Sequence, residues 1–126
     1  MQKRCVLLVE DNADQRELYT YILETEGFQV RSVTNGKEAL EELQRSTPDV
    51  ILTDIAMPGM SGLELVKWIR ERAEFSRLPI VVMTASEKDF LTWAGAAGAN
   101  ETLAKPFDSE DLFMALLKVL PPTKGN

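Results

Sequence analysis

The sequence predicts an α/β domain, in which a doubly wound sheet of five parallel strands carries helices on both faces. Short apolar runs alternate five times along the 126 residues with segments whose apolar side chains recur at helical spacing. The runs at residues 50–52 and 80–83 are apolar at every position, which is typical of strands buried on both faces of a parallel sheet. Alternating strand and helix units favour parallel strands joined by right-handed crossovers.

The predicted strands are short runs bounded by turn-forming or charged residues. In chain order they lie at residues 5–9, 28–33, 48–54, 79–84 and 102–104. The second run alternates only loosely between apolar and polar residues, as an edge strand would. For five strands we expect the flavodoxin-like order 2-1-3-4-5, which places the topological switch point between strands one and three.

Each predicted helix follows a polar residue that can cap its first turn. These residues are Asn12, Asn35, Ser61, Ser86 and Asp108. Gln15 and Glu64 stand three residues after the first and third of them, which is the spacing of a capping box. Gly27 suits the position just after the first helix, and Pro48 stops the second. The third helix is expected to carry an apolar stripe that continues to Ala73.

Parallel strands all point one way, so their carboxyl ends share one edge of the sheet, where ligands bind in open α/β folds. Five side chains that carry chemistry fall at this edge, after four different strands: Glu10, Asp11, Asp54, Thr84 and Lys105. Each alone has an ordinary explanation, such as a helix-start acid, a strand-end hydroxyl or a surface lysine. All of these explanations would have to hold together, so a shared site is favoured.

The residue types at this edge suit phosphoryl chemistry on a carboxylate. Three neighbouring carboxylates repel one another unless a cation neutralises them, and oxygen-only donors favour Mg²⁺. A carboxylate beside a metal can be a covalent nucleophile, as Asp54 would be in an aspartyl-phosphate mechanism. Lys105 can pair with one phosphoryl oxygen, and the Thr84 hydroxyl can donate to another.

The composition excludes several other classes of protein. A net charge of −6 and a pI near 4.7 argue against nucleic-acid binding by this chain alone. The absence of histidine excludes histidine bases and histidine metal ligands. The single cysteine, Cys5, excludes an internal disulfide, and we expect a buried thiol in a reducing, cytoplasmic compartment. No apolar run has the length of a signal peptide or a transmembrane helix, so no membrane insertion is expected.

Four motifs appear in order along the chain: LLVEDN, PDVILTDIAMPGMSG, PIVVMTAS and LAKPF. They contain, respectively, the acid pair, Asp54, Thr84 and Lys105, and together with their spacing they cover essentially the whole sequence. One of them alone would be a weak indication, whereas all four in order are highly specific. With these motifs the sequence closely resembles a receiver (response-regulator) domain of two-component signalling, of the chemotaxis-regulator kind.

The resemblance implies that Asp54 is the phosphoacceptor. It would take a phosphoryl group from a phosphohistidine of a sensor histidine kinase or a histidine phosphotransfer protein, and signal through a conformational change. Thr84 and Lys105 would hold the phosphoryl group, and the Lys105–Pro106 peptide bond would be cis. The donor histidine would belong to the partner, which agrees with the absence of histidine here.

The resemblance also implies a metal site. Asp11, Asp54 and the backbone carbonyl of Ala56 would bind Mg²⁺, with Mn²⁺ as an alternative ion, and Glu10 would assist through water.

Three positions bear on how such a domain is switched. Many family members carry an aromatic residue three positions before the lysine, and Thr102 stands there, so the usual inward swing of a ring is not expected. Two positions flank the phosphoryl site, two residues after the phosphoacceptor and two after the threonine, and both are small: Ala56 and Ser86. We expect that they leave room for an attacking water, so a bulky residue in place of Ala56 should change the dephosphorylation rate.

Other functions are less compatible with these residues. A phosphatase of the haloacid dehalogenase type needs a second aspartate two residues after its nucleophile, where Ala56 stands. A flavin binder needs a phosphate loop after strand one, where Glu10 and Asp11 would repel a phosphate. A pseudo-receiver that serves only as an interaction module would usually lack one of the acids, the threonine or the lysine, and all are present.

The expected organisation is one receiver domain over residues 1–121, followed by a short tail or the start of a linker at 122–126. As an alternative, the receiver is part of a larger transcription factor or hybrid kinase. We expect no enzymatic activity except on the domain's own phosphorylation and dephosphorylation. The cognate kinase, the downstream target and the pathway are not identified by the sequence.

Overall fold

The computed structural model describes residues 3–85 and 98–122. The strands are β1 (Cys5–Val9), β2 (Gln29–Val33), β3 (Val50–Asp54), β4 (Ile80–Thr84) and β5 (Glu101–Ala104). The helices are α1 (Ala13–Thr25), α2 (Gly36–Arg45), α3 (Gly62–Arg70), the 3₁₀ turn η1 (Ala73–Phe75) and α6 (Ser109–Val119). The predicted fourth helix, with its cap at Ser86, lies outside the described residues.

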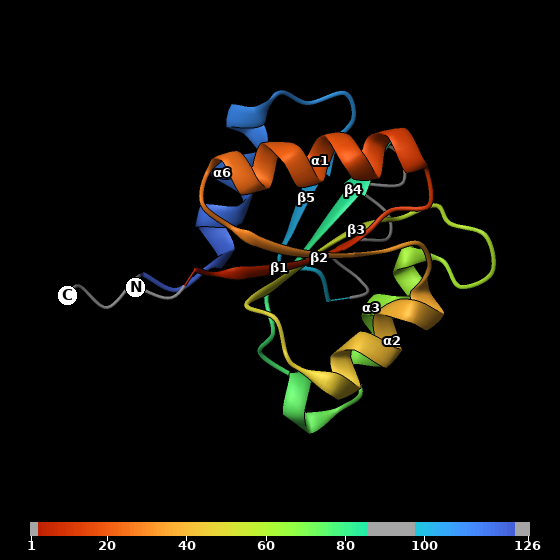
Figure 1. The fold of residues 1–126 in the computed structure, drawn as a ribbon. Coiled ribbons are helices and arrows are strands. Elements are labelled where there is room, and N and C mark those ends of the chain that lie inside the picture. The colour runs from red at the N-terminus through yellow and green to blue at the C-terminus, as the bar shows by residue number, and fades with distance from the viewer. Residues whose placement is uncertain (1–2, 86–97, 123–126) are drawn as a thin grey trace.

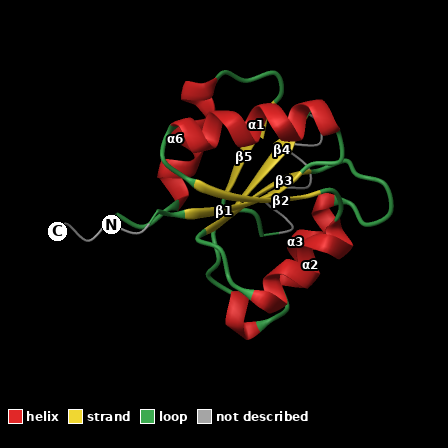
Figure 2. Cartoon of the chain, viewed as in Figure 1, coloured by secondary structure: helices red, strands yellow, loops and turns green. Residues whose placement is uncertain are grey.

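The five strands form one parallel sheet in the order β2-β1-β3-β4-β5, which confirms the predicted topology. β3 and β4 are buried at every residue, whereas β2 at the sheet edge has none fully buried, as its loose alternation predicted. Helices cover both faces, with α1 and α6 on one and α2 and α3 on the other (Figure 1). Figure 2 shows the strands lying between the two layers of helices.

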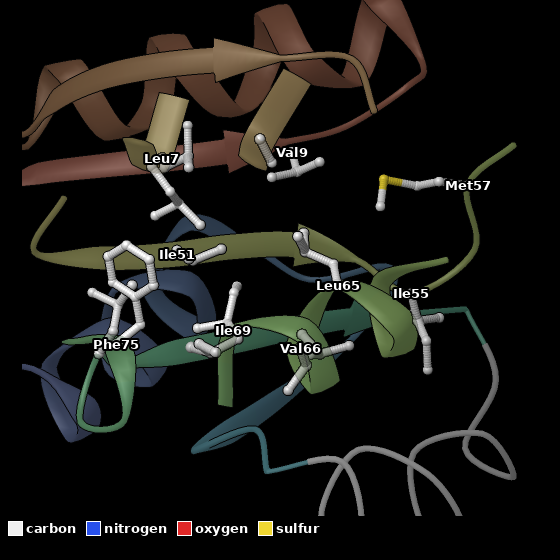
Figure 3. Packing of buried hydrophobic residues seen from close by; sticks show 14 residues of the cluster. Leu7, Val9, Ile51, Ile55, Met57, Leu65, Val66, Ile69 and Phe75 are labelled. Carbon is white, nitrogen blue, oxygen red and sulfur yellow. The ribbon is translucent and has the colours of Figure 1, made fainter. Parts of the chain in front are cut away.

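Two apolar layers, one on each face, hold the helices against the sheet. Successive residues of a strand point to opposite faces, so Val6 and Leu8 of β1 join the layer under α1 and α6, and Leu7 and Val9 join the other layer. Figure 3 shows the second layer, where Ile69 of α3 lies close to β3. Packing on both faces fixes the direction and register of each strand, and therefore the place where each carboxyl end emerges.

The predicted caps set the beginnings of the described helices. Reciprocal capping boxes open α3 at Ser61 and α6 at Asp108, and Asn12 caps α1 by accepting a hydrogen bond from the Gln15 backbone N–H. Gly27 follows α1 with φ of 92°, a left-handed conformation that glycine adopts without strain.

Two packing predictions were wrong. Ala73 does not continue the apolar stripe of α3, because the helix ends at Arg70 and Ala73 is an exposed residue of η1; Phe75 is buried there instead. Cys5, the first residue of β1, is only partly buried, whereas a buried thiol was predicted. Within residues 3–85 and 98–122, no helix is long and apolar enough to cross a membrane.

Candidate functional site

Three carboxylates meet at the carboxyl ends of β1 and β3. The two strands are paired up to Val9 and Thr53, so the acids that follow, Glu10 and Asp54, emerge side by side. One carboxylate oxygen each of Glu10, Asp11 and Asp54 lies within 4.8 Å of the others. Glu10 is fully buried, Asp54 is buried and Asp11 is exposed, so the cluster opens to solvent on the Asp11 side.

Lys105 brings a positive charge into this cluster from the end of β5. Its backbone N–H donates to the Thr84 carbonyl at 2.7 Å, and the Lys105–Pro106 peptide bond is cis, the configuration that the resemblance implies. Its Nζ lies 3.0 Å from Glu10 Oε1 and 3.0 Å from Asp54 Oδ2. The ammonium therefore bridges the ends of β1 and β3, which are 95 and 51 positions away along the chain.

A third partner of Lys105 was missed by the sequence analysis. Gln15 Oε1, in the first turn of α1, accepts from Lys105 Nζ at 2.7 Å, the shortest of the three contacts. One turn further along α1, the Tyr19 ring lies 5.7 Å from Lys105 Nζ and stacks on Phe107 at 5.1 Å between centroids. Gln15 and Tyr19 are spaced i, i+4, the spacing that puts two side chains on one helix face; that spacing was the only available signal.

Burial and charge shift the acid–base properties of this cluster. Burial raises the pKa of Glu10, and the charge of Asp54 adds to this effect, against the hydrogen bonds from the Asn12 backbone and from Lys105. Burial alone would lower the pKa of Lys105, but its hydrogen bonds to Asp54 and Glu10, together with their charges, outweigh that effect and raise it. Burial also raises the pKa of the Tyr19 hydroxyl. Lys105 is thus held as a cation beside three carboxylates.

The loop from β3 to α3 begins directly after Asp54. Ala56 is exposed two residues after Asp54, whereas Met57 turns inward and is buried. Gly59 has φ of 78°, in the left-handed region, and Gly62 begins α3 with its N–H donating to the Ile55 carbonyl at 2.8 Å. The loop thus returns directly to the end of β3.

The remaining predicted positions are distributed around this centre. Thr84 is fully buried at the end of β4, and Thr102 is partly buried on β5, paired with Val82. Ser86 lies outside the described residues. The structure therefore brings together the acid pair, Asp54 and Lys105, with Thr84 on the strand between β3 and β5.

The donor set fits a hard divalent cation. The ligand atoms of the cluster are carboxylate oxygens from the ends of two adjacent strands. Among the described residues, no histidine or cysteine joins these three acids. Asp11 leaves one side open to solvent, as Mg²⁺ requires because it keeps several waters. Placing a cation here would also offset the cost of burying the Glu10 charge.

The chain is similar to known proteins over most of its length. The family model described as "Response regulator receiver domain" matches residues 6–117. The phosphate regulon transcriptional regulatory protein PhoB of Rhizobium meliloti is 39% identical over 116 residues, which cover 91% of this chain and 51% of that protein. The chain therefore spans about half the length of this relative.

Solved structures show the same fold. The chemotaxis response regulator CheY4 of Vibrio cholerae has a TM-score of 0.88 and 33% identity, covering 94% of this chain and 100% of that one. The receiver domain of the sensor histidine kinase PA1611 of Pseudomonas aeruginosa, solved with a magnesium ion coordinated in its active site cleft, has a TM-score of 0.86 and 31% identity, covering 94% and 98%. With its fold, its acidic pocket and this match over most of its length, the chain belongs to the response regulator receiver domains of two-component systems.

Proposed function

We propose that Asp54 is the residue on which this receiver domain accepts its phosphoryl group, from a phosphohistidine of a histidine kinase or phosphotransfer protein. An Asp54 carboxylate oxygen attacks the phosphorus, the P–O bond forms, and the P–N bond to the imidazole breaks. The bonding pair returns to the imidazole nitrogen, which takes up a proton. The products are an acyl phosphate on Asp54 and a neutral histidine on the donor.

One observation carries this proposal: the carboxylate that ends β3 lies beside an ammonium and two further acids. Lys105 Nζ stands 3.0 Å from Asp54 Oδ2, and an oxygen of Asp11 lies within 4.8 Å on the open side. Cationic charge beside the attacked group stabilises the charge that develops on the phosphoryl oxygens. Thr84 is buried at the end of the adjacent strand β4, and its hydroxyl would donate to another of these oxygens.

We propose that Mg²⁺, or Mn²⁺ as an alternative ion, is held by Asp11, Asp54 and the Ala56 backbone carbonyl. Glu10 would act through water. When bound, the ion supplies charge neutralisation at the phosphoryl oxygens and at the crowded carboxylates. The magnesium ion in the cleft of the PA1611 receiver domain supports this assignment.

The small or polar neighbours of the site are proposed to tune the lifetime and the output of the phosphorylated state. Ala56 is exposed beside Asp54, which supports access for an attacking water from that side. Ser86 is proposed to leave similar room on the other side. Thr102 takes the place of the aromatic relay, so transmission is proposed to proceed without the swing of a ring.

The biological setting is inferred from the relatives. A stand-alone regulator, a transcription factor and a hybrid kinase all remain compatible, because CheY4, PhoB and PA1611 each supply a matching receiver. We propose residues 1–121 as the receiver and 122–126 as a tail or the start of a linker. We further propose that it acts in the cytoplasm, without binding nucleic acid itself, and that its catalysis is limited to its own phosphorylation and dephosphorylation.

The decisive test is incubation with acetyl phosphate and Mg²⁺, followed by intact mass measurement. Wild type is expected to gain one phosphoryl group, and Asp54→Asn none. The matched control is Asp49→Asn, which should label like wild type. Asp49 is an exposed aspartate directly before the first residue of β3. Labelling that survives Asp54→Asn, or that persists in excess EDTA, would overturn the assignment.

A further inference from the structure

The side chain of Gln15 does not make the contact that its position in the sequence predicts. In a capping box, the third residue of a helix would accept a hydrogen bond from the backbone N–H of the capping residue. In α1 the Asn12 N–H donates instead to Glu10 Oε2 at 3.1 Å, and the Gln15 side chain turns to Lys105. Glu10 thus performs the capping that would otherwise occupy Gln15.

Two other described helices, α3 and α6, show the ordinary arrangement. Glu64 in α3 and Asp111 in α6 accept from the N–H of their own capping residue, at 3.0 and 3.2 Å. Glu38 in α2 likewise turns back, to Thr34 just before its helix. Among these third-position side chains, only Gln15 contacts a residue 90 positions away, so its contact comes from the site rather than from helix capping.

Lys105 has three N–H donors, and each meets a different acceptor. The acceptors are Glu10 Oε1, Asp54 Oδ2 and Gln15 Oε1, which come from the end of β1, the end of β3 and the first turn of α1. An ammonium can only donate, so the Gln15 amide must present its oxygen. Phosphoryl oxygens added at Asp54 would meet the donor that already faces Asp54, while Glu10 and Gln15 keep the other two.

We propose that Gln15 is a positioning residue for phosphoryl transfer: its Oε1 holds one N–H of Lys105, so that another points at the group on Asp54. This inference rests on the proposed role of Asp54 as phosphoacceptor. Without the Gln15 oxygen, the freed N–H would turn to the two carboxylates, and the ammonium would be drawn toward Glu10. Phosphoryl transfer would then proceed with a misplaced cation.

A neutral acceptor suits this position better than a charged one. A carboxylate at residue 15 would be a fourth acid beside Glu10, Asp11 and Asp54, and would add to their repulsion. It would also bind the ammonium more strongly, in competition with the phosphoryl oxygens. The Gln15 amide supplies a short hydrogen bond at 2.7 Å without either cost.

The test is Gln15→Met, which keeps an unbranched side chain of similar length and removes the acceptor. The maximal phosphorylation rate at saturating acetyl phosphate and Mg²⁺ is expected to fall about tenfold, as for loss of one hydrogen bond to a charged group. The affinity for Mg²⁺ should stay within about twofold, since no charge or ligand changes. Gln44→Met, on the exposed side of α2, is the matched control and should behave as wild type.

A double-mutant cycle separates positioning from general structure. In a Lys105→Met background, Gln15→Met should change the rate by less than about twofold, because the residue through which it acts is gone. If Lys105→Met is too slow to time, the unfolding free energies of the same four proteins in urea supply the cycle. There too, the cost of Gln15→Met should disappear when Lys105 is absent.

Two results would overturn the proposal. One is a wild-type rate in Gln15→Met, and the other is an effect of the same size with and without Lys105. Both are distinct from failure of the proposed function, in which the wild-type protein itself would gain no phosphoryl group on Asp54.

Discussion

Gly62 lies against the backbone of Asp54, with no room for a side chain between them. A Cβ added at Gly62 would stand 2.1 Å from the Asp54 carbonyl oxygen and 2.8 Å from the Cα of Ile55. Both neighbours are backbone atoms at the end of a fully buried strand, so neither can rotate away. The first turn of α3 is therefore packed directly onto the residue that the proposed chemistry uses.

Gly62→Ala is expected to destabilise the fold and disturb the site together. Overpacking typically costs about 1–3 kcal/mol, which outweighs the gain in helix propensity of up to about 1 kcal/mol. Urea unfolding measures the first effect, and Mg²⁺ affinity the second. Gly36→Ala is the comparison, because its added Cβ would meet only side-chain atoms of Met60, at 2.7 Å from Sδ, 2.9 Å from Cβ and 3.0 Å from Cγ.

We expect the Gly36 variant to lose less stability than the Gly62 variant. Part of its loss should disappear in a Met60→Ala background, which removes Sδ and Cγ but keeps the Cβ. Equal losses of unfolding free energy in the two variants would show that the backbone at the end of β3 moves aside as easily as the Met60 side chain. That result would contradict the close packing of Gly62 on Asp54.

Removal of Asp11 is expected to abolish most of the stabilisation that Mg²⁺ provides. A ligand that binds only the folded state adds about 2.7 kcal/mol to the free energy of unfolding when its concentration is 100 times its Kd. Asp11 contributes one of the three clustered oxygens, so Asp11→Asn should reduce this gain at a fixed Mg²⁺ concentration. The measurement is urea unfolding with and without Mg²⁺.

Asp14→Asn is the matched control for that experiment. Asp14 is an exposed acid in the first turn of α1 and lies outside the cluster, so its variant should retain the full gain. Equal stabilisation of both variants by Mg²⁺ would show that the ion binds elsewhere or only through diffuse charge.

Most of the fold was predictable because local and long-range signals agree. The apolar runs gave the strands to within one or two residues, and polar caps placed the helix beginnings at Asn12, Ser61 and Asp108. The meeting of Glu10 and Asp54 followed from topology alone, since parallel strands bring their carboxyl ends to one edge.

The sequence could not predict which of several nearby residues takes a given hydrogen bond or a given buried position. The Asn12–Gln15 spacing predicts a capping box, and only the coordinates show that Glu10 takes the Asn12 N–H. Ala73 continues the helical spacing of α3, yet the chain has already turned at Arg70 to bury Phe75. In each case a residue outside the expected spacing supplies the better contact.

The carboxylate of Glu38 is expected to make stability depend on pH. Glu38 Oε1 accepts two hydrogen bonds from Thr34, one from its backbone N–H and one from its hydroxyl, each at 2.7 Å. These bonds, that of the backbone most of all, lower the pKa of Glu38 below its ordinary value of 4.5. A lowered pKa in the folded state means that ionised Glu38 stabilises the fold. This contribution is complete above the ordinary value and is lost as the pH falls through the lowered pKa.

Glu38→Gln tests this sign. Wild type should be the more stable protein at neutral pH, and the gap between the two unfolding free energies should narrow on acidification. Glu41→Gln, on the exposed side of the same helix, should show no such convergence. A gap that stays constant or widens toward low pH would contradict the assignment.

Arg70 joins three segments that the sheet does not connect directly. Its Nε donates to the Gly98 carbonyl at 2.9 Å, its Nη1 to the Phe75 carbonyl at 3.0 Å and its Nη2 to Asn100 Oδ1 at 2.7 Å. Asn100 Oδ1 also accepts from the Ile80 N–H at 2.8 Å, so the network reaches the beginning of β4. A planar guanidinium matches this divergent set of acceptors, and a lysine ammonium on a single nitrogen does not.

Arg70→Met is therefore expected to lower the free energy of unfolding by about 2 kcal/mol, because it removes three hydrogen bonds from a charged donor, two of them to partly buried carbonyls. Arg70→Lys should recover only part of this loss, since one nitrogen cannot reach all three acceptors. Arg45→Met is the control: Arg45 pairs with Glu42 at 3.1 Å but its side chain is 78% exposed, and such pairs contribute about 0.2–1 kcal/mol. Full recovery by lysine, or equal losses at the two arginines, would show that position 70 contributes only its charge, and that the fork of the guanidinium does not hold the segment before β5 in place.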